Sequence, residues 1–353
     1  MRRDRWMVAL FTVILMTALL ATPVQACTIF MAEEDETVLA GNNEDWMYSW
    51  ETSMILSAPD DDSYGRVCFY DSSYVQGGMN ECGLFYDGAT CPVSEVPYDA
   101  AKEQLGMDFG ELLLASCATV DDAILMLEGA NIPSGFSDHL LIADASRNSA
   151  VLEWMEGRLN IIRKDKDYQL VTNFWLTDPS LGWYPCERFA TAEKTLQSVA
   201  PSVEGFAGIL NSTKQDWGDG GTLYSNVYNL TNREVYVFCK GDFTKACKVS
   251  LTEQLQKLQP GEEVKADIKD LGFDTPVAVK AVSAVSSAKV SETTQNELPL
   301  SAETAPSVTA EPAAVSLQEN ALHKVPWYLW VLAVAALLSL IAAIWRIATK
   351  KAP

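Results

Sequence analysis

Two long apolar runs, one near each end, most constrain what this chain of 353 residues can fold into. The first, Trp6 to Ala21, follows a start with three arginines, and Val24 and Ala26 then place small residues directly before Cys27. This succession of basic, apolar and small segments predicts an export signal peptide over residues 1–26. Cleavage after Ala26 makes Cys27 the first residue of the mature chain.

The second apolar run, Trp327 to Trp345, contains no charged residue and is long enough to cross the roughly 30 Å core of a bilayer as a helix. Three basic residues follow it, and such a flank stays on the cytoplasmic side. We therefore expect a transmembrane helix over residues 326–346 and a cytoplasmic tail over 347–353. The chain is predicted to be exported and held in the cell membrane by a single pass, with its folded domain outside the cytoplasm.

The segment before the second run differs in composition from the rest of the chain. It is rich in Ala, Val, Ser, Thr, Pro and Glu and poor in aromatic residues, which is typical of chain that cannot bury a core. We interpret residues 277–325 as a disordered, low-complexity linker. The folded domain is therefore expected over residues 27–258, with an extension to residue 276 left open.

Charge and composition exclude several classes of function. The chain carries 47 acidic and 26 basic residues, a net charge of −21, which argues against a nucleic-acid partner because phosphate binding needs clustered Lys and Arg. The charge is compatible with a cationic substrate without implying one. With only two histidines and no Cys-x-x-Cys pair among eight cysteines, we expect neither a metal site nor a cofactor. Disulfide pairing and oligomeric state stay open.

Short β-rich segments alternate with amphipathic segments between residues 27 and 258. Helices are expected at 109–116, 120–128, 187–199 and 202–211, and Thr119 with Asp122 has the spacing of a capping box before the second of them. A turn is expected at Gly77-Gly78, and a hairpin is expected from 222–229 and 234–239. This order favours an α+β fold over a parallel doubly wound sheet.

An N-terminal Cys27 would carry its own base. The α-amine titrates near about 7.7–8.0 and the thiol near about 8.5, so the amine can accept the thiol proton at neutral pH without a histidine. Such a site also needs a group that holds the amine and donors that stabilise an oxyanion. The alternative is that Cys27 is the lipid-modified residue of a lipoprotein. His139 is interpreted as a packing or hydrogen-bonding residue and not as a catalytic base.

Five sequence blocks, which follow one another along the chain, resemble the motifs of a known enzyme family. The chain resembles the choloylglycine hydrolase and penicillin V acylase family of N-terminal nucleophile (Ntn) hydrolases, including their acyltransferase-like relatives. The resemblance covers residues 27–240 and implies a four-layer αββα sandwich and hydrolysis of linear amides. The blocks are Cys27-Thr28-Ile29-Phe30, Gly41-Asn42-Asn43-Glu44-Asp45-Trp46, Gly78 to Leu84, His139 to Asp144 with Glu153, and Val171-Thr172-Asn173.

The resemblance implies roles for particular residues. Cys27 matches the nucleophile, Asp45 matches the aspartate that orients the N-terminal group, and Asn173 matches an asparagine near the nucleophile and the oxyanion.

Three weaker candidates for substrate or oxyanion binding follow from the same comparison. Asn42 stands where bile-salt hydrolases and penicillin V acylases have an arginine, and Thr90 stands where the family has a second oxyanion asparagine. Arg188 resembles a recurring arginine of the acyltransferase-like relatives and can supply the missing charge.

The resulting hypothesis is an extracytoplasmic, membrane-tethered amidohydrolase that cleaves a small linear amide through a thioester on Cys27. The substrate is thus expected to be a small-molecule amide. Two alternatives remain open at this point: an acyltransferase with the same nucleophile, and a non-catalytic lipoprotein or adhesion ectodomain.

Overall fold

The computed structural model describes residues 27–72 and 74–279. The predicted signal peptide (1–26), transmembrane helix (326–346) and cytoplasmic tail (347–353) lie outside the described residues, as does the predicted linker beyond residue 279. None of the helices formed by the described residues has the length and apolar character needed to cross a bilayer.

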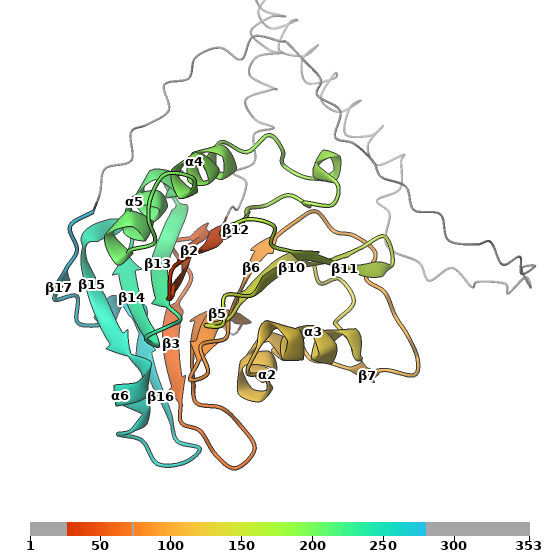
Figure 1. The fold of residues 1–353 in the computed structure, drawn as a ribbon, viewed down its shortest axis with the longest axis horizontal. Helices are drawn as coiled ribbons and strands as arrows, with labels where there is room; N and C mark the ends of the chain where they lie inside the picture. The colour runs from red at the N-terminus through yellow and green to blue at the C-terminus, as the bar shows by residue number, and fades with distance from the viewer. Residues whose placement is uncertain (1–26, 73, 280–353) are drawn as a thin grey trace, which may run out of the picture. The chain divides into compact units, whose positions relative to one another are not determined.

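Two antiparallel sheets pack face to face, and a pair of helices covers the outer face of each (Figure 1). The seven-stranded sheet has the order β12 (Tyr168–Val171), β1 (Thr28–Glu34), β2 (Thr37–Met47), β13 (Gly220–Asn229), β14 (Glu234–Cys239), β15 (Asp242–Ser250), β17 (Thr275–Pro276). The eight-stranded sheet has the order β11 (Arg158–Arg163), β10 (Ser149–Met155), β9 (Asp138–Ala143), β6 (Phe85–Thr90), β5 (Tyr74–Asn80), β4 (Arg66–Asp71), β3 (Thr52–Ser57), β16 (Glu263–Asp267). The four-layer αββα order is therefore the one that the sequence predicts.

The helices begin and end close to the predicted residues. α2 (Phe109–Ser116) and α3 (Val120–Glu128) cover the eight-stranded sheet, and the capping box of Thr119 and Asp122 starts α3 as expected. α4 (Glu187–Leu196) and α5 (Val203–Thr213) cover the seven-stranded sheet. The remaining elements are short: β7 (Glu103–Gln104), β8 (Ala130–Asn131), α6 (Leu251–Leu255) and the 3₁₀ turns η1 (Pro179–Leu181) and η2 (Ile268–Asp270).

The alternation of β1 shows how the layers are held together. Ile29 and Met31 point into the core between the sheets, whereas Phe30 points outward and packs on Phe206 of α5 with ring centroids 4.9 Å apart. All three β1 side chains are fully buried, because the strand is covered by a sheet on one face and by helices on the other. The first strand of the domain is thus firmly anchored.

The turn expected at Gly77-Gly78 is wrong, because both glycines lie inside β5. A Cβ atom at Gly78 would lie 2.3 Å from the carbonyl oxygen of Val67, and one at Gly77 would lie 2.3 Å from a carboxylate oxygen of Asp87. The glycines therefore serve close packing against neighbouring strands and not a change of chain direction.

Residues beyond 258 supply an edge strand to each sheet. β16 pairs with β3, β17 pairs with β15, and Ile268 between them is fully buried in the inter-sheet core. The packed chain continues through Val277, the first residue of the expected linker, whose backbone N–H donates to the carbonyl oxygen of Thr244. All eight cysteines are unpaired thiols.

Candidate active site

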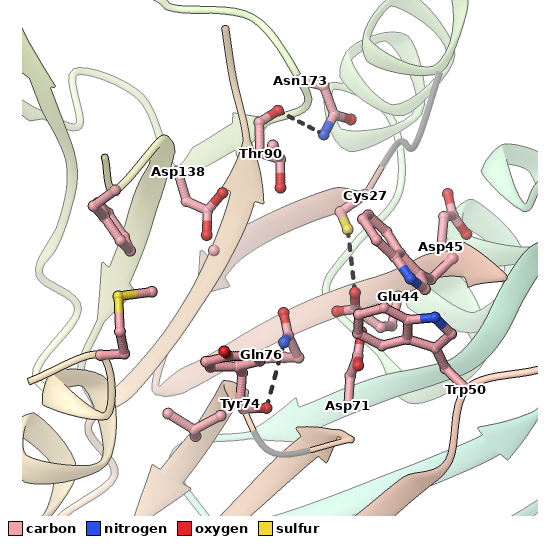
Figure 2. A pocket seen from close by; sticks show the side chains of 15 residues that line it. Cys27, Glu44, Asp45, Trp50, Asp71, Tyr74, Gln76, Thr90, Asp138 and Asn173 are labelled. Atoms are coloured by element: carbon pink, nitrogen blue, oxygen red, sulfur yellow. Dashed lines mark hydrogen bonds between the residues drawn. The ribbon is translucent and has the colours of Figure 1, made fainter. Parts of the chain in front are cut away.

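Cys27 lies at the start of β1, and its thiol forms part of the wall of a cavity of about 200 Å³. Three other residues singled out from the sequence, Asp45, Thr90 and Asn173, line the same cavity (Figure 2). Asp45 lies near the end of β2, Thr90 ends β6 and Asn173 follows β12, so segments far apart in the sequence come together at the cavity. The fold therefore gathers these candidates around one sulfur atom.

Asn173 has its amide orientation fixed from both ends. Its Nδ2 donates to the backbone carbonyl of Thr90 at 2.8 Å, and its Oδ1 accepts a hydrogen bond from Nη2 of Arg188 at 3.1 Å. Only an amide oxygen can accept from a guanidinium, so Nδ2 faces the Thr90 side of the cavity. One N–H of Nδ2 remains as a donor for a ligand in the cavity, whose wall Asn173 shares with Cys27.

Arg188, near the start of α4, connects three parts of the site. Its Nη1 donates to the backbone carbonyl of Cys27 at 2.5 Å and to the hydroxyl of Thr28 at 2.9 Å, while Nη2 holds Asn173. The planar guanidinium suits this task because its donors diverge in a fixed fork. Arg188 thus ties the start of β1 to the loop after β12.

Asp45 is fully buried near the end of β2, where a β-bulge at Thr222–Tyr224 of β13 disturbs the pairing. The hydroxyl of Thr222 donates to Oδ1 of Asp45 at 2.5 Å, whereas Oδ2 has no hydrogen-bond partner among the described residues. Burial raises the pKa of Asp45 to about 7, although the bond from Thr222 and the charge of Arg188 act in the opposite direction.

The Cys27 thiol donates to Oε1 of Glu44 at a distance of 3.6 Å. Burial raises the pKa of this thiol well above its usual range, and the charges of Glu44 and Asp45 raise it further, while a hydrogen bond from the backbone N–H of Asp45 lowers it. A thiolate therefore forms here only with a proton acceptor and a positive charge close by. A free N-terminal amine on Cys27 would meet both needs. It accepts the thiol proton, and the ammonium that it becomes supplies the positive charge.

Glu44 was missed as a site residue even though it stands within the Gly41–Trp46 block. One signal in the sequence could have found Glu44. It lies two residues after the candidate Asn42, and residues two apart on a strand point to the same face of the sheet. Burial raises the pKa of Glu44 well above its usual range, and the neighbouring charges of Asp71 and Asp45 add to this effect.

The other two weaker candidates, Asn42 and Thr90, do not connect the parts of the site as Arg188 does. Asn42 is fully buried and does not line the cavity, and its amide lowers the pKa of both Glu44 and Asp87. Thr90 lines the cavity, but its carbonyl accepts from Asn173, and its side chain lowers the pKa of Asp138.

Two further carboxylates in the cavity wall, Asp71 and Asp138, were not found from the sequence. Asp71 ends β4 and Asp138 begins β9, so both come from the sheet opposite Cys27. Burial raises the pKa of Asp71 to about 7, and it also raises the pKa of Asp138. Among residues 27–72 and 74–279, no group of three or more His, Cys, Asp or Glu side chains has a metal-binding arrangement.

A family model described as acyl-coenzyme A:6-aminopenicillanic acid acyl-transferase matches residues 31–242, which is more than half of the chain. The chain belongs to this family. The match begins just after Cys27 and includes Asp45, Thr90, Asn173 and Arg188. The family relationship expected from the sequence blocks is thereby confirmed.

Solved structures of related enzymes share the fold. Penicillin V acylase from Agrobacterium tumefaciens aligns with a TM-score of 0.57 and 18% identity, over 72% of this chain and 100% of the other. An arginine-to-leucine variant of conjugated bile acid hydrolase from Clostridium perfringens gives a TM-score of 0.54 and 18% identity, over 72% and 100%. No curated protein matches the chain in sequence. The fold is thus that of Ntn hydrolases.

Proposed function

We propose that this protein is an amide hydrolase whose nucleophile is the thiol of Cys27, freed as the N-terminal residue by cleavage after Ala26. The observation that carries the proposal is the position of the Cys27 sulfur in the wall of a cavity that Asp45 and Asn173 also line. Membership of a family of acyl-transferring enzymes with the Ntn hydrolase fold supports it.

In the first step, the α-amine of Cys27 accepts the thiol proton and the sulfur attacks the carbonyl carbon of the amide. Asp45 is the proposed partner of the resulting ammonium, because its buried carboxylate has an oxygen without a hydrogen-bond partner and Arg188 already favours its charged form. The carbonyl oxygen becomes an oxyanion, for which Asn173 offers the remaining N–H of Nδ2.

The tetrahedral intermediate then breaks its C–N bond. The ammonium of Cys27 returns its proton to the leaving nitrogen, so a neutral amine departs and a thioester remains on the sulfur. Water attacks this thioester with the α-amine again acting as base, and the carboxylic acid leaves as the thiol is restored.

Acyl transfer is the second candidate, favoured by the description of the matching family model. An amine that reaches the thioester before water would receive the acyl group through the same base. The two outcomes are separated by adding a primary amine to a working hydrolase assay and measuring the ratio of new amide to free acid by mass spectrometry.

Processing is the sharpest test of the mechanism. Intact mass first establishes whether the purified protein begins with an unmodified Cys27. Two forms of the full chain are then compared on a panel of N-acyl amides, one trimmed to Cys27 and one that keeps a few preceding residues. The uncut form should be inactive because its nitrogen is a non-basic amide, and trimming should restore activity. Full activity of the uncut form, verified by mass, would remove the mechanism, whereas a lipid mass on Cys27 would support the lipoprotein alternative.

We also propose that the domain works outside the cytoplasm and is held at the membrane by a transmembrane helix at residues 326–346. This part rests on the sequence alone. Protease added to intact cells should cut within residues 280–319 and release an active soluble domain. A domain that stays in the membrane after such a cut would point to a lipid on Cys27.

A further inference from the structure

The cavity at Cys27 is unusually acidic for its size. Four carboxylates line it, those of Glu44, Asp45, Asp71 and Asp138, in a space of about 200 Å³. Among the described residues, no lysine or arginine forms an ion pair with Glu44, Asp71 or Asp138. Buried carboxylates without a cationic partner are costly, so they point to a positive charge that arrives from elsewhere.

Three of these carboxylates present an oxygen that nothing in the described chain satisfies. Oε2 of Glu44, Oδ2 of Asp45 and Oδ1 of Asp71 are buried and have no hydrogen-bond partner, and each residue is at most 3% exposed. Figure 2 shows Asp71 and Glu44 on the same side of the cavity as Tyr74 and Gln76, with the Cys27 sulfur directed toward Glu44. An arriving donor would therefore meet acceptors beside the nucleophile.

The cations of the proposed mechanism do not account for all of this charge. The proposed α-ammonium of Cys27 and the guanidinium of Arg188 are two positive charges, and we assign both to Asp45, whose pKa the charge of Arg188 lowers. Glu44 and Asp71 form the remaining pair in the cavity wall (Figure 2), and the charge of Asp71 raises the pKa of Glu44. The two come from opposite sheets, on β2 and β4, and they repel each other unless a proton or a cation lies between them.

Aromatic rings complete the surroundings of this pair. Trp46 and Trp50 pack edge to face with ring centroids 5.0 Å apart, and both line the cavity together with Tyr74 and Phe136. Trp50 and Tyr74 are exposed at the rim. Carboxylates combined with aromatic faces favour an organic ammonium group over a neutral or anionic one.

We propose that the substrates are linear amides that carry a small ammonium group within a few bonds of the scissile carbonyl, bound between Glu44 and Asp71. The reaction rests on the proposed function, but the binding of the cation does not. The cavity of about 200 Å³ has room for a short alkylammonium group beside the scissile amide.

Binding is tested first, without any turnover. The processed full chain is titrated by calorimetry with n-butylammonium chloride, with n-butanol and with sodium butyrate. We expect saturable binding of butylammonium with a Kd at least about tenfold below that of either other probe. Equal affinity for the three, or no binding of the amine, would overturn the proposal and would mean that the ammonium of Cys27 and bound protons already neutralise the cavity.

Turnover is tested with anilides that differ only in the end of a short acyl chain, which is ammonium, methyl or carboxylate, at several chain lengths. A second set carries the same three groups on the amine side of the scissile bond. Comparing the two sets shows on which side of the amide the enzyme prefers the ammonium group. The ammonium member should have the highest kcat/KM in at least one set, by about tenfold or more over its methyl counterpart. Hydrolysis of the whole series without such a preference refutes the cation site and leaves the proposed function standing.

Asp71→Asn removes one carboxylate and keeps its shape. It should reduce the preference for the ammonium member over the methyl member by about tenfold and weaken butylammonium binding by a similar factor. Asp61→Asn, which removes the same charge from an exposed turn outside the cavity, is the matched control and should keep both values. A preference unchanged in Asp71→Asn contradicts the site. Amine binding without hydrolysis of any amide supports the site and contradicts the proposed function.

Discussion

Nδ1 of His139 lies 3.1 Å from Oε1 of Glu153, and neither side chain is exposed to solvent. The other ring nitrogen donates to the backbone carbonyl of Thr172 at 2.6 Å, while the Glu153 carboxylate accepts from the backbone N–H groups of Leu176 and Thr177. The pair therefore holds the chain on both sides of Asn173. His139 is a hydrogen-bonding core residue, as the sequence suggested, and with Glu153 it positions the loop of the site.

Glu153→Gln tests this pair. Burial lowers the pKa of His139, but Cys91 and Glu153 outweigh burial and raise it to about 10, so the imidazole is charged at neutral pH. Removing its partner leaves a buried cation unpaired, and we expect a loss of about 3–5 kcal/mol in the free energy of unfolding. Urea unfolding at pH 7 measures the loss. Glu156→Gln, on the exposed turn after β10, is the control, and a loss below about 1 kcal/mol in Glu153→Gln would show that the pair is not a charged one.

Arg188→Lys keeps the positive charge and loses the fork. A lysine ammonium cannot reach the Cys27 carbonyl, the Thr28 hydroxyl and Asn173 in one geometry, so the orientation of the Asn173 amide should relax. We expect kcat to fall by about 10²-fold with a smaller change in KM, because oxyanion stabilisation acts in the transition state. Steady-state kinetics decide, with Lys194→Arg on the same helix as the control. A kcat within about threefold of wild type would restrict Arg188 to a structural role.

Local signals predicted the helices well and the close packing of strands poorly. The start of α3 follows from Thr119 and Asp122, which bond to each other within one turn and need nothing from the rest of the chain. Gly77 and Gly78 gave a turn signal of equal strength, but the atoms that require glycine there belong to Val67 and Asp87, on neighbouring strands. A sequence does not show which strands become neighbours.

The same distinction separates the site residues that were found from those that were missed. Asp45 and Asn173 came from ordered sequence blocks, Thr90 and Arg188 came as weaker candidates from the same family resemblance, and the fold brings all four around the start of β1. Asp71 was missed because it lies on a strand of the opposite sheet. Its isolated carboxylate is unremarkable until the two sheets pack together and bury it.

The stability of the protein should depend on the ionisation of Asp71. Burial raises the pKa of its folded form to about 7 from an ordinary value near 3.8, so the folded state holds the proton more tightly than the unfolded state. The contribution of Asp71 is therefore fully present below about pH 4 and is lost as the pH rises toward 7. Wild type should lose about 2–4 kcal/mol more than Asp71→Asn between pH 4.5 and pH 8 in urea unfolding. Parallel curves for the two proteins would contradict the raised pKa.

The C-terminal edge strands should be required for a stable domain. Ending the chain after residue 258 removes β16, which pairs with β3 over five residues, and removes the fully buried Ile268. Loss of this burial and of one edge of each sheet should lower the Tm by about 10 °C or more. A chain ending after residue 279 is the matched control and should melt like the full protein. Equal melting of the two shortened chains would restrict the stable domain to residues 27–258.

Asp45→Asn is the strongest test of the proposed catalytic pair. The substitution keeps the acceptor for Thr222 and removes the charge that favours the Cys27 ammonium, so the amine should lose its proton at lower pH. We expect kcat/KM to fall by about 10²–10⁴-fold and the acid-side limb of its pH profile to move to lower pH. That limb reports Asp45 and the amine together, because a carboxyl group with a pKa of about 7 titrates in the same range as its partner. Asp242→Asn, at the exposed start of β15, serves as the control. An unshifted limb with a rate within about twofold of wild type would make Asp45 a structural residue and leave the Cys27 amine without its proposed partner.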